Sequence, residues 1–462
     1  MTLIKSISGI RGTIGGKPSD NLTPIDAVKF AAAYGTFIKK RNPNKKEINV
    51  VIGRDARISG KMISSLVANT LVGLGINVID LGLSTTPTVE VAVPLENADG
   101  GIILTASHNP KQWNALKLLN EKGEFLNGTD GEEILKIAES EDLDFVAVDD
   151  LGTYTKNNTY LQKHIQEVLN LELVDVEAIK KANFKVVVDG VNSTGGIFIP
   201  ALLKELNVEC VELYCTPNGH FPHNPEPLKE HLTDISNLVV KEKADLGIVV
   251  DPDVDRLAII CEDGSMFGEE YTLVACADYV LGRLGGGNTV SNLSSSRALR
   301  DVTEKHGGTY TASAVGEVNV VIKMKETNTV IGGEGNGGII YPASHYGRDS
   351  LVGVALFLSL LAHKKISCRS LRNSYPSYFM SKNKIELTPD IDVDNILETM
   401  ATKYTNEDVN TIDGVKIDFA EEWIHLRKSN TEPIIRIYTE AKSQEAADAL
   451  AIRFIKEIKE II

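Results

Sequence analysis

The segment LGIVVDPDVDR, residues 246–256, contains an apolar run that is followed at once by three aspartates at alternating positions. A short apolar run without polar alternation is typical of a strand that is buried on both faces, as in the parallel sheets of α/β proteins. Ligands of such sheets bind beyond the carboxyl ends of the strands. The segment therefore predicts an α/β fold with a functional loop at residues 251–256.

Similar short runs, rich in β-branched residues, recur along the first 360 residues, and helical patterns lie between them. We predict strands at 48–52, 101–104, 185–188, 246–250 and 257–260, and helices at 26–40 and 59–74. Strands that alternate with helices indicate α/β architecture with right-handed crossovers. The last 80 residues instead show the order strand, helix, three strands and helix, which indicates a separate α+β unit.

The length and composition narrow the class of protein. A chain of 462 residues predicts three domains or four small ones. The 48 Lys and Arg residues against 63 Asp and Glu residues give a net charge of −15, which argues against nucleic acid or an anionic membrane as the main partner. The sequence shows neither an apolar run long enough to span a bilayer nor a secretory signal. Five scattered cysteines are typical of reduced thiols, so we expect a cytoplasmic protein.

The loop TASHNP, residues 105–110, follows the predicted strand 101–104. Ser107 beside His108 at the end of a buried strand is a candidate activated nucleophile. The same residue types also suit the cap of a helix, and both interpretations stay open here. Adjacent side chains rarely bond each other, so His108 need not be the base for Ser107. Lys117 could reach back and act as acid or base.

The acidic loop contains Asp251, Asp253 and Asp255. Alternate side chains point the same way, so the three carboxylates can converge on one hard cation such as Mg²⁺, which would also offset their mutual repulsion. An EF-hand is disfavoured because Arg256 stands at the position that requires glycine. The main alternative is a haloacid-dehalogenase-type motif with Asp251 as phosphoryl acceptor, and a solvated acidic turn is another.

Two further loops have the composition of ligand-binding segments. GGEGNGG, residues 332–338, has five glycines and could present Glu334 and Asn336 to the hydroxyl groups of a sugar, or form a flexible turn. RKSNTEP, residues 427–433, combines cations, hydroxyls and backbone N–H groups that suit a phosphate group. A polar hairpin connection explains the second loop equally well.

In this order and at these separations, the four loops resemble the motifs of the α-D-phosphohexomutase superfamily, which includes phosphoglucomutase, phosphomannomutase and phosphoglucosamine mutase. SGIRG at residues 8–12 and GRDAR at residues 53–57 are similar to two further motifs, so the resemblance runs from Ser8 to Pro433. It implies a heart-shaped protein with a central cleft. Three related α/β domains with mixed sheets between helices would precede a TATA-binding-protein-like α+β domain. Each expected domain carries one functional loop. Domain 1–152 has the phosphoserine loop, domain 153–257 the metal-binding loop, domain 258–370 the sugar-specificity loop and domain 371–462 the phosphate-binding loop.

The resemblance also implies a reaction and roles for individual residues. Ser107, carried as phosphoserine, would exchange a phosphoryl group with the 1- and 6-positions of a hexose phosphate through a 1,6-bisphosphate intermediate. Mg²⁺ would be held by Ser107, Asp251, Asp253 and Asp255. The other catalytic residues would be Lys117 as the preferred acid or base, Arg11 and His108. The substrate would be bound by Arg256, Glu334, Asn336, Arg427, Ser429, Asn430, Thr431 and Arg436.

Three positions differ from the pattern of many relatives. Asn336 stands in place of serine, Gly338 in place of a histidine that is a proposed acid or base, and Pro252 in place of glycine. These variants are similar to archaeal-type phosphoglucosamine or phosphomannose mutases. We therefore expect conversion of glucosamine 6-phosphate to glucosamine 1-phosphate, with a phosphoglucomutase/phosphomannomutase as the alternative. Two more distant alternatives are a haloacid-dehalogenase-type phosphatase and a non-catalytic phosphosugar-binding protein. We expect a monomer or homodimer.

Overall fold

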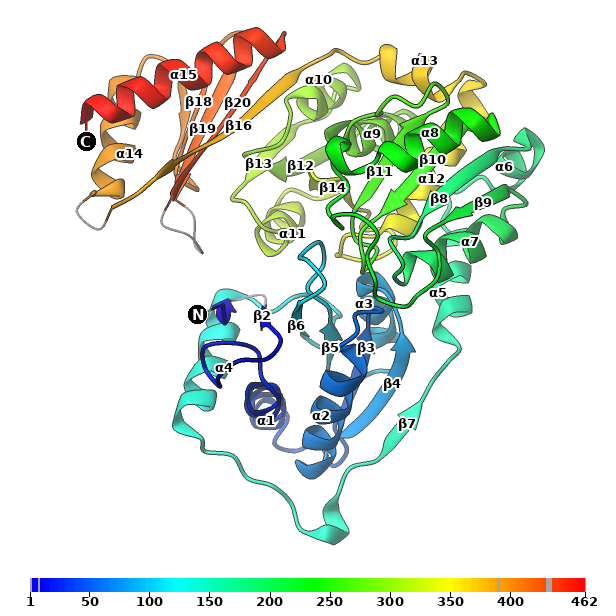
Figure 1. The fold of residues 1–462 in the computed structure, drawn as a ribbon, viewed down its shortest axis with the longest axis vertical. Helices are drawn as coiled ribbons and strands as arrows, with labels where there is room; N and C mark the ends of the chain where they lie inside the picture. Colours follow the sequence, from blue (N-terminus) through cyan, green and yellow to red (C-terminus); the bar gives the residue numbers. More distant parts are fainter. Residues whose placement is uncertain (1, 7–8, 389–390, 429–433, 462) are drawn as a thin grey trace.

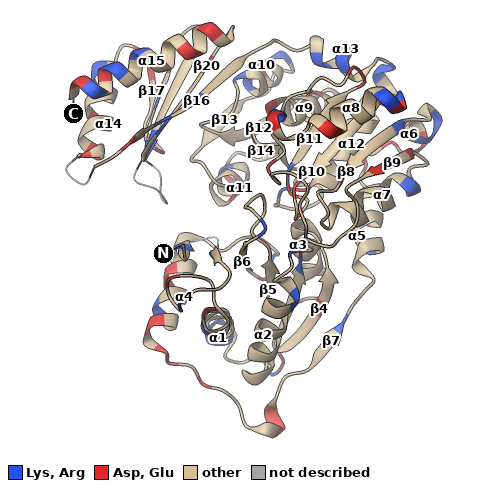
Figure 2. Cartoon of the chain, in the orientation of Figure 1, with Lys and Arg blue, Asp and Glu red and all other residues tan. Residues whose placement is uncertain are grey.

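The computed structural model describes residues 2–6, 9–388, 391–428 and 434–461. Four β-sheets follow one another along the chain, and each sheet is packed against helices (Figure 1). The first three units are α/β and the last is α+β, so the predicted fold class is confirmed. Acidic and basic positions are interspersed over the outer helices of the described chain and do not gather into one basic face (Figure 2).

Domain I is built on a seven-stranded mixed sheet with the order β1-β2-β6-β5-β3-β4-β7. Its strands are β1 (Ile4–Ser6), β2 (Gly9–Thr13), β3 (Asn49–Arg54), β4 (Asn77–Leu83), β5 (Gly100–Leu104), β6 (Trp113–Leu119) and β7 (Tyr154–Lys156). Helices α1 (Pro24–Arg41), α2 (Gly60–Gly73) and α4 (Gly128–Ser140) pack on one face and α3 (Thr86–Leu95) on the other. All of β5 is buried, which explains its uninterrupted apolar sequence.

Domain II has a four-stranded sheet with the order β11-β10-β8-β9. Its strands are β8 (Lys185–Asp189), β9 (Glu209–Leu213), β10 (Leu246–Val250) and β11 (Leu257–Cys261), and its helices are α5 (Tyr160–Leu169), α6 (Val176–Ala182), α7 (Gly195–Glu205) and α8 (Thr233–Glu242). Two predicted boundaries are corrected by strand pairing. β11 pairs with β10, so the second sheet extends beyond residue 257. β7 pairs with β4, so the first sheet extends beyond residue 152.

Domain III has the sheet order β13-β12-β14-β15. Its strands are β12 (Asn288–Asn292), β13 (Tyr310–Ser313), β14 (Thr329–Glu334) and β15 (Gly338–Ile340), and its helices are α9 (Glu269–Leu284), α10 (Ala298–Lys305), α11 (Glu317–Glu326), α12 (Ser350–Lys364) and α13 (Cys368–Asn373). Domains II and III share one continuous apolar core, in which α12 is buried for most of its length. None of the described helices combines the length and apolarity needed to cross a membrane.

Domain IV is an antiparallel sheet with the order β16-β20-β19-β18-β17 and two helices on one face (Figure 1). Its elements are β16 (Phe379–Glu386), α14 (Val393–Lys403), β17 (Asp408–Asn410), β18 (Val415–Asp418), β19 (Trp423–Lys428), β20 (Ile434–Ala441) and α15 (Gln444–Ile461). The predicted order of strands and helices is confirmed, and the short β17 is an addition to it.

One buried arginine of domain III docks domain IV. The guanidinium of Arg297 donates to Asp418 Oδ1 at 2.5 Å and to three backbone carbonyls of the turn between β18 and β19. Its backbone N–H donates to Glu440 Oε1 at 3.0 Å. Because one guanidinium joins an ion pair to several carbonyl contacts, this contact sets the position of β19 relative to domain III.

The same interface contains His425, which is 2% exposed. Its Nε2–H donates to the carbonyl of Asp413 at 2.7 Å, and its Nδ1 accepts from the hydroxyl of Ser294 at 2.9 Å. Burial lowers the pKa of His425 to about 4. Below pH 6.5 the unfolded chain binds a proton that the folded chain excludes until about pH 4, so the free energy of unfolding is expected to fall by about 3 kcal/mol between these values.

Urea unfolding of domain IV at pH 6.5 and pH 4.5, followed through the fluorescence of buried Trp423 in a Trp113→Phe background, checks this expectation. His425→Asn should show a loss of stability between the two pH values that is about 2 kcal/mol smaller than in the parent. His220→Asn, which changes an exposed histidine, serves as control. Equal losses in the parent and in His425→Asn would contradict the assignment.

Candidate active site

The serine of the TASHNP loop lies directly beyond the carboxyl end of β5. Ser107 is 7% exposed, and its backbone has a left-handed φ of 48°. Its hydroxyl donates to Asp251 Oδ2 at 2.6 Å, across the boundary between domains I and II, and lies 3.3 Å from His108 Nδ1. Burial, followed by the charge of Arg256, lowers the pKa of His108 to about 2, so this imidazole is neutral at pH 7.

A buried arginine that the sequence analysis missed supports this loop. The Arg57 side chain is fully buried, and its Nε donates to Asp55 at 2.9 Å. The other guanidinium nitrogens donate to four carbonyls of the loop and the start of β6, those of Ser107, Asn109, Pro110 and Trp113. Asp55 in turn accepts from the hydroxyl of Thr105 at 2.7 Å. The motif GRDAR was the available signal for this role.

A small cavity of about 70 Å³ opens beside the serine and is lined in part by Arg11, Ser107, His108 and Lys117. Arg11 lies on β2, which pairs with β6 and so is brought next to Lys117 by the sheet. Its Nε is buried and has no hydrogen-bond partner among the described residues. Burial lowers the pKa of Arg11. An anion in the cavity would supply the partner that this guanidinium requires.

The acidic loop follows β10 and is folded around its own first carboxylate. Asp251 Oδ1 accepts the backbone N–H groups of Asp255 and Arg256, both at 3.1 Å. Val254 has a φ of 65°, an uncommon conformation for a β-branched residue and one that concentrates at functional sites. The turn thereby directs the carboxylates of Asp251, Asp253 and Asp255 to one point, where their oxygens lie within 4.8 Å of one another.

The three carboxylates fit a hard divalent cation. All three aspartates are fully buried, and Asp253 Oδ1 and Asp255 Oδ1 have no hydrogen-bond partner among the described residues. Burial and the other two carboxylates raise the pKa of Asp251 well above its ordinary value. Such a cluster is costly without a positive charge among the oxygens, and Mg²⁺ prefers this kind of ligand.

The lysine predicted as acid or base reaches the same loop from β6. Residue 117 is opposite Ile103 of β5 in the antiparallel register, which brings Lys117 close to the serine loop. Its Nζ donates to Asp253 Oδ2 at 2.7 Å and lies 3.5 Å from Asp255 Oδ2. Burial alone would lower the pKa of Lys117, but these two carboxylates outweigh burial and raise it. Lys117 is therefore charged and holds a proton that it can donate.

A second buried arginine that the sequence analysis missed joins the acidic loop to the sugar loop. Arg348 is 8% exposed. Its guanidinium donates to Asp255 Oδ2 at 2.7 Å, to Glu334 Oε2 at 2.9 Å and to Glu317 Oε2 at 3.0 Å. The three partners of Arg348 come from three separate segments of the chain. The sequence around Arg348 itself, GRD at residues 347–349, is therefore the only local signal of its role.

The space for Arg348 depends on Gly338, the position at which many relatives have histidine. A Cβ atom at this residue would lie 2.3 Å from Arg348 Cδ. We therefore expect Gly338→Ala to displace the guanidinium from Asp255 and Glu334. The expected cost is about 1–3 kcal/mol of stability and about a tenfold loss of kcat/KM. Urea unfolding and steady-state kinetics measure the two effects.

Gly282→Ala is the matched control for that substitution. Gly282 lies in α9 of the same domain, and its nearest neighbour would be 3.4 Å from an added Cβ atom. The control should keep the parent's kinetics. A Gly338→Ala variant that also keeps them would show that the position of Arg348 does not matter for turnover.

The remaining predicted substrate-binding residues lie in two places. Glu334 is buried and accepts from Asn292 as well as from Arg348, and Asn336 Oδ1 accepts the backbone N–H of Gly338. Arg256 is paired with Glu226 at 3.3 Å. In domain IV, Arg427 lies opposite Arg436 across the β19–β20 pair, and Arg427 contacts Asp413 at 3.3 Å. The predicted phosphate ligands that lie outside the described residues are Ser429, Asn430 and Thr431.

A serine hydroxyl that can carry a phosphoryl group, set against a carboxylate loop that fits a divalent cation and against a charged lysine, is the arrangement of a phosphoryl-transfer enzyme. The particular family follows from comparison with known proteins. Models of the phosphoglucomutase/phosphomannomutase α/β/α domains I, II and III and of the C-terminal domain match residues 3–144, 160–264, 268–378 and 384–457. The chain belongs to this family of phosphohexomutases and is an isomerase.

Relatives with different names cover nearly the whole chain. A phosphoglucomutase/phosphomannomutase of Thermococcus kodakarensis is 36% identical over 96% of this chain and 98% of its own length. A phosphoglucosamine/phosphogalactosamine mutase of Sulfurisphaera tokodaii is 32% identical over 98% of each chain. The crystal structure of a phosphoglucomutase/phosphomannomutase family protein of Burkholderia thailandensis matches with a TM-score of 0.85 and 25% identity over 99% of this chain and 97% of that one.

Proposed function

We propose that Ser107 is the phosphoryl carrier of a hexose-phosphate mutase that acts through a 1,6-bisphosphate intermediate. The observation that carries the proposal is the 2.6 Å contact between the Ser107 hydroxyl and Asp251, which puts the serine of domain I at the cation-binding loop of domain II. In the haloacid-dehalogenase alternative, Asp251 would be the nucleophile. Membership of the mutase family gives no support to that role, and here Asp251 accepts a hydrogen bond from the serine hydroxyl.

Phosphorylation would add a charge of about −1.5 to −2 next to three buried carboxylates. Mg²⁺ bound by Asp251, Asp253, Asp255 and a phosphoryl oxygen would neutralise that charge and the charge on the transferring group. Lys117 then donates its proton to Ser107 Oγ as the phosphoryl group leaves for a sugar hydroxyl, and it takes up the proton that this hydroxyl gives up, so that the lysine ends the step charged as it began. The guanidinium of Arg11, which lines the same cavity, stabilises the equatorial phosphoryl oxygens.

The return step uses the same residues in reverse. The intermediate presents its second phosphate to Ser107; Lys117 donates a proton to the sugar oxygen that leaves and takes up the hydroxyl proton of Ser107. Arg427 and Arg436, paired across β19 and β20, would hold the phosphate that is not reacting, together with the residues of the loop 429–433. Because the site for the non-reacting phosphate stays in place while the sugar turns around, one serine can exchange a phosphoryl group with both ends of the substrate.

For the substrate we favour glucosamine phosphate over glucose and mannose phosphates. The sugar loop offers Glu334 and the amide of Asn336. Glu334 Oε2 accepts from Arg348, and its second lone pair can accept from a positively charged amino group more strongly than from a neutral hydroxyl. The Sulfurisphaera tokodaii relative is named for amino sugars, which supports this choice. The name of the Thermococcus kodakarensis relative supports the alternative, a phosphoglucomutase/phosphomannomutase.

A substrate panel tests the proposal. Glucosamine 6-phosphate, glucose 1-phosphate and mannose 1-phosphate are each offered with Mg²⁺ and the matching 1,6-bisphosphate. We expect kcat/KM to be at least about tenfold higher for the amino sugar, the difference that one well-placed charged contact provides. A preference for glucose or mannose phosphate would overturn the substrate assignment. Release of inorganic phosphate in place of isomerisation would overturn the proposed reaction.

A further inference from the structure

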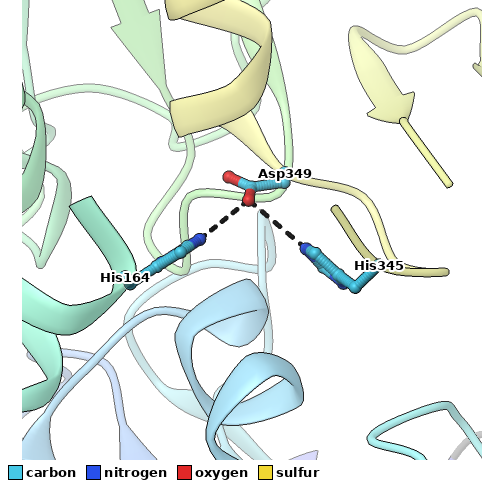
Figure 3. Close-up of side chains that lie close together, drawn as sticks. All are labelled: His164, His345 and Asp349. Atoms are coloured by element: carbon cyan, nitrogen blue, oxygen red, sulfur yellow. Dashed lines mark hydrogen bonds and ion pairs between the residues drawn. The ribbon is translucent and has the colours of Figure 1, made fainter. Parts of the chain in front are cut away.

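A second group of metal-ligand side chains lies where domains II and III meet. His164 comes from α5, His345 from the loop after β15, and Asp349 from the N-terminus of α12. His164 Nε2 lies 2.9 Å and His345 Nε2 lies 3.3 Å from the same oxygen, Asp349 Oδ2. Figure 3 shows both imidazole rings pointing their edges at that carboxylate. The rings are nearly perpendicular, at 75°.

The outer atoms of all three side chains are held by other partners. His164 Nδ1 lies 2.8 Å from the hydroxyl of Thr88, and His345 Nδ1 lies 3.4 Å from Glu90 Oε2. Asp349 Oδ1 accepts two backbone N–H groups at the start of α12. These contacts orient one nitrogen of each ring and one carboxylate oxygen inward. Histidines that bind metal ions are oriented by hydroxyl and carboxylate groups in the same way.

A further buried carboxylate, that of Glu90, lies beside the cluster. Glu90 on α3 is 1% exposed, and neither of its carboxylate oxygens has a hydrogen-bond partner among the described residues. Its carboxylate lies against His345, so that two buried carboxylates, those of Glu90 and Asp349, flank one imidazole. Buried carboxylates are stable when they are paired with positive charge or bind a metal ion. A cation bound by the three side chains would place positive charge near both carboxylates, and Glu90 would then be the outer partner of His345 Nδ1.

We propose that His164, His345 and Asp349 bind one divalent transition-metal cation of the zinc class. Two imidazole nitrogens and one carboxylate oxygen suit zinc or cobalt, whereas magnesium prefers oxygen ligands alone. Ligand atoms bound at about 2.0–2.1 Å in a tetrahedral shell lie about 3.3 Å apart. The two nitrogens lie 2.9 and 3.3 Å from Asp349 Oδ2, and all three ligand atoms lie within 4.8 Å of one another, so the group has the size that one ion requires. Water would complete the shell, and the ion would join domains II and III, with domain I supplying Thr88 and Glu90.

The site is tested with Co²⁺, whose visible absorption reports ligand geometry. The tag-free, metal-free chain is titrated with Co²⁺ in excess Mg²⁺, so that the aspartate loop is occupied. We expect one equivalent of Co²⁺ with the intense visible bands of a four-coordinate ion. His345→Gln and His164→Gln should lose these bands, while Asp253→Asn in the aspartate loop should keep them. His306→Gln, which breaks a His–Asp contact of 2.8 Å outside the cluster, is the matched control.

Two measurements on the unaltered chain keep the test decisive if a variant fails to fold. X-ray absorption of the Zn²⁺-loaded protein should show two imidazole nitrogens at about 2.0–2.1 Å. One equivalent of Zn²⁺ should raise the Tm by at least about 3 °C, because it binds the folded state only. A zinc shell of oxygen ligands alone would overturn the proposal. Binding that disappears in Asp253→Asn but persists in His345→Gln would also overturn it.

Discussion

Replacing Ser107 with alanine is expected to lower kcat/KM for hexose-phosphate isomerisation by at least about 10⁴-fold, because the covalent carrier of the phosphoryl group is removed. The structure leaves no obvious substitute. Asp251, the carboxylate that the serine hydroxyl contacts, would be occupied by the cation. The fold should be retained, since the loop is held by Arg57 through backbone carbonyls and not through the serine side chain. A coupled assay for each sugar phosphate measures the loss.

Mass spectrometry of the intact chain gives an independent readout, because the alanine variant should not take up a phosphoryl group from the bisphosphate. Ser84→Ala is the matched control. Ser84 is also a buried serine of domain I, and its hydroxyl has no hydrogen-bond partner among the described residues. It should retain both phosphorylation and turnover. An alanine variant at position 107 that isomerises at the rate of the parent would refute the proposed mechanism.

Replacing Asp253 with asparagine is expected to lower kcat about 10³-fold and to raise the half-saturating concentration of Mg²⁺ at least about tenfold. The substitution removes one of the negative charges that would hold the cation. It also removes the carboxylate that accepts from Lys117 at 2.7 Å and from Thr86 at 2.5 Å. The lysine would then lose the partner that orients its proton toward the serine.

Kinetics over a Mg²⁺ titration separate these two effects, because excess cation should restore part of the activity but not the orientation of Lys117. Asp263→Asn is the matched control, since Asp263 lies in the exposed turn after β11 and contacts only that turn and Arg369. It should show the parent's dependence on Mg²⁺. An unchanged Mg²⁺ dependence of Asp253→Asn would place the cation elsewhere.

Much of the fold was predictable because burial determines the pattern of a strand over a few residues. β5 and β10 lie inside sheets that are covered on both faces, and both read as uninterrupted apolar runs in the sequence. The domain boundaries were harder to predict from the sequence. Whether β11 belongs to the second or the third sheet depends on which strand it pairs with, and its apolar sequence fits either sheet.

The candidate site also contains residues that the sequence predicted and residues that it missed. Ser107 and the three aspartates were predictable because each lies just after a strand and is part of a short motif, and Lys117 was predictable because it follows the serine motif closely in the sequence. Arg57 and Arg348 were missed because the motifs GRDAR and GRD contain an arginine but carry no sign of its burial. Their roles depend on partners up to 93 residues away, such as Asp255 for Arg348.

By itself, the sequence determined the kind of chemistry: a hydroxyl and three carboxylates in short loops that follow strands, and a lysine ten residues after the hydroxyl. These features are local, because the residue types and their spacing lie within a few positions of one another. Only the tertiary structure decided which groups meet. The hydrogen bond from Ser107 to Asp251 and the convergence of His164, His345 and Asp349 join segments more than 140 residues apart. Such contacts arise when sheets and helices of different domains pack together, and no local pattern specifies that packing.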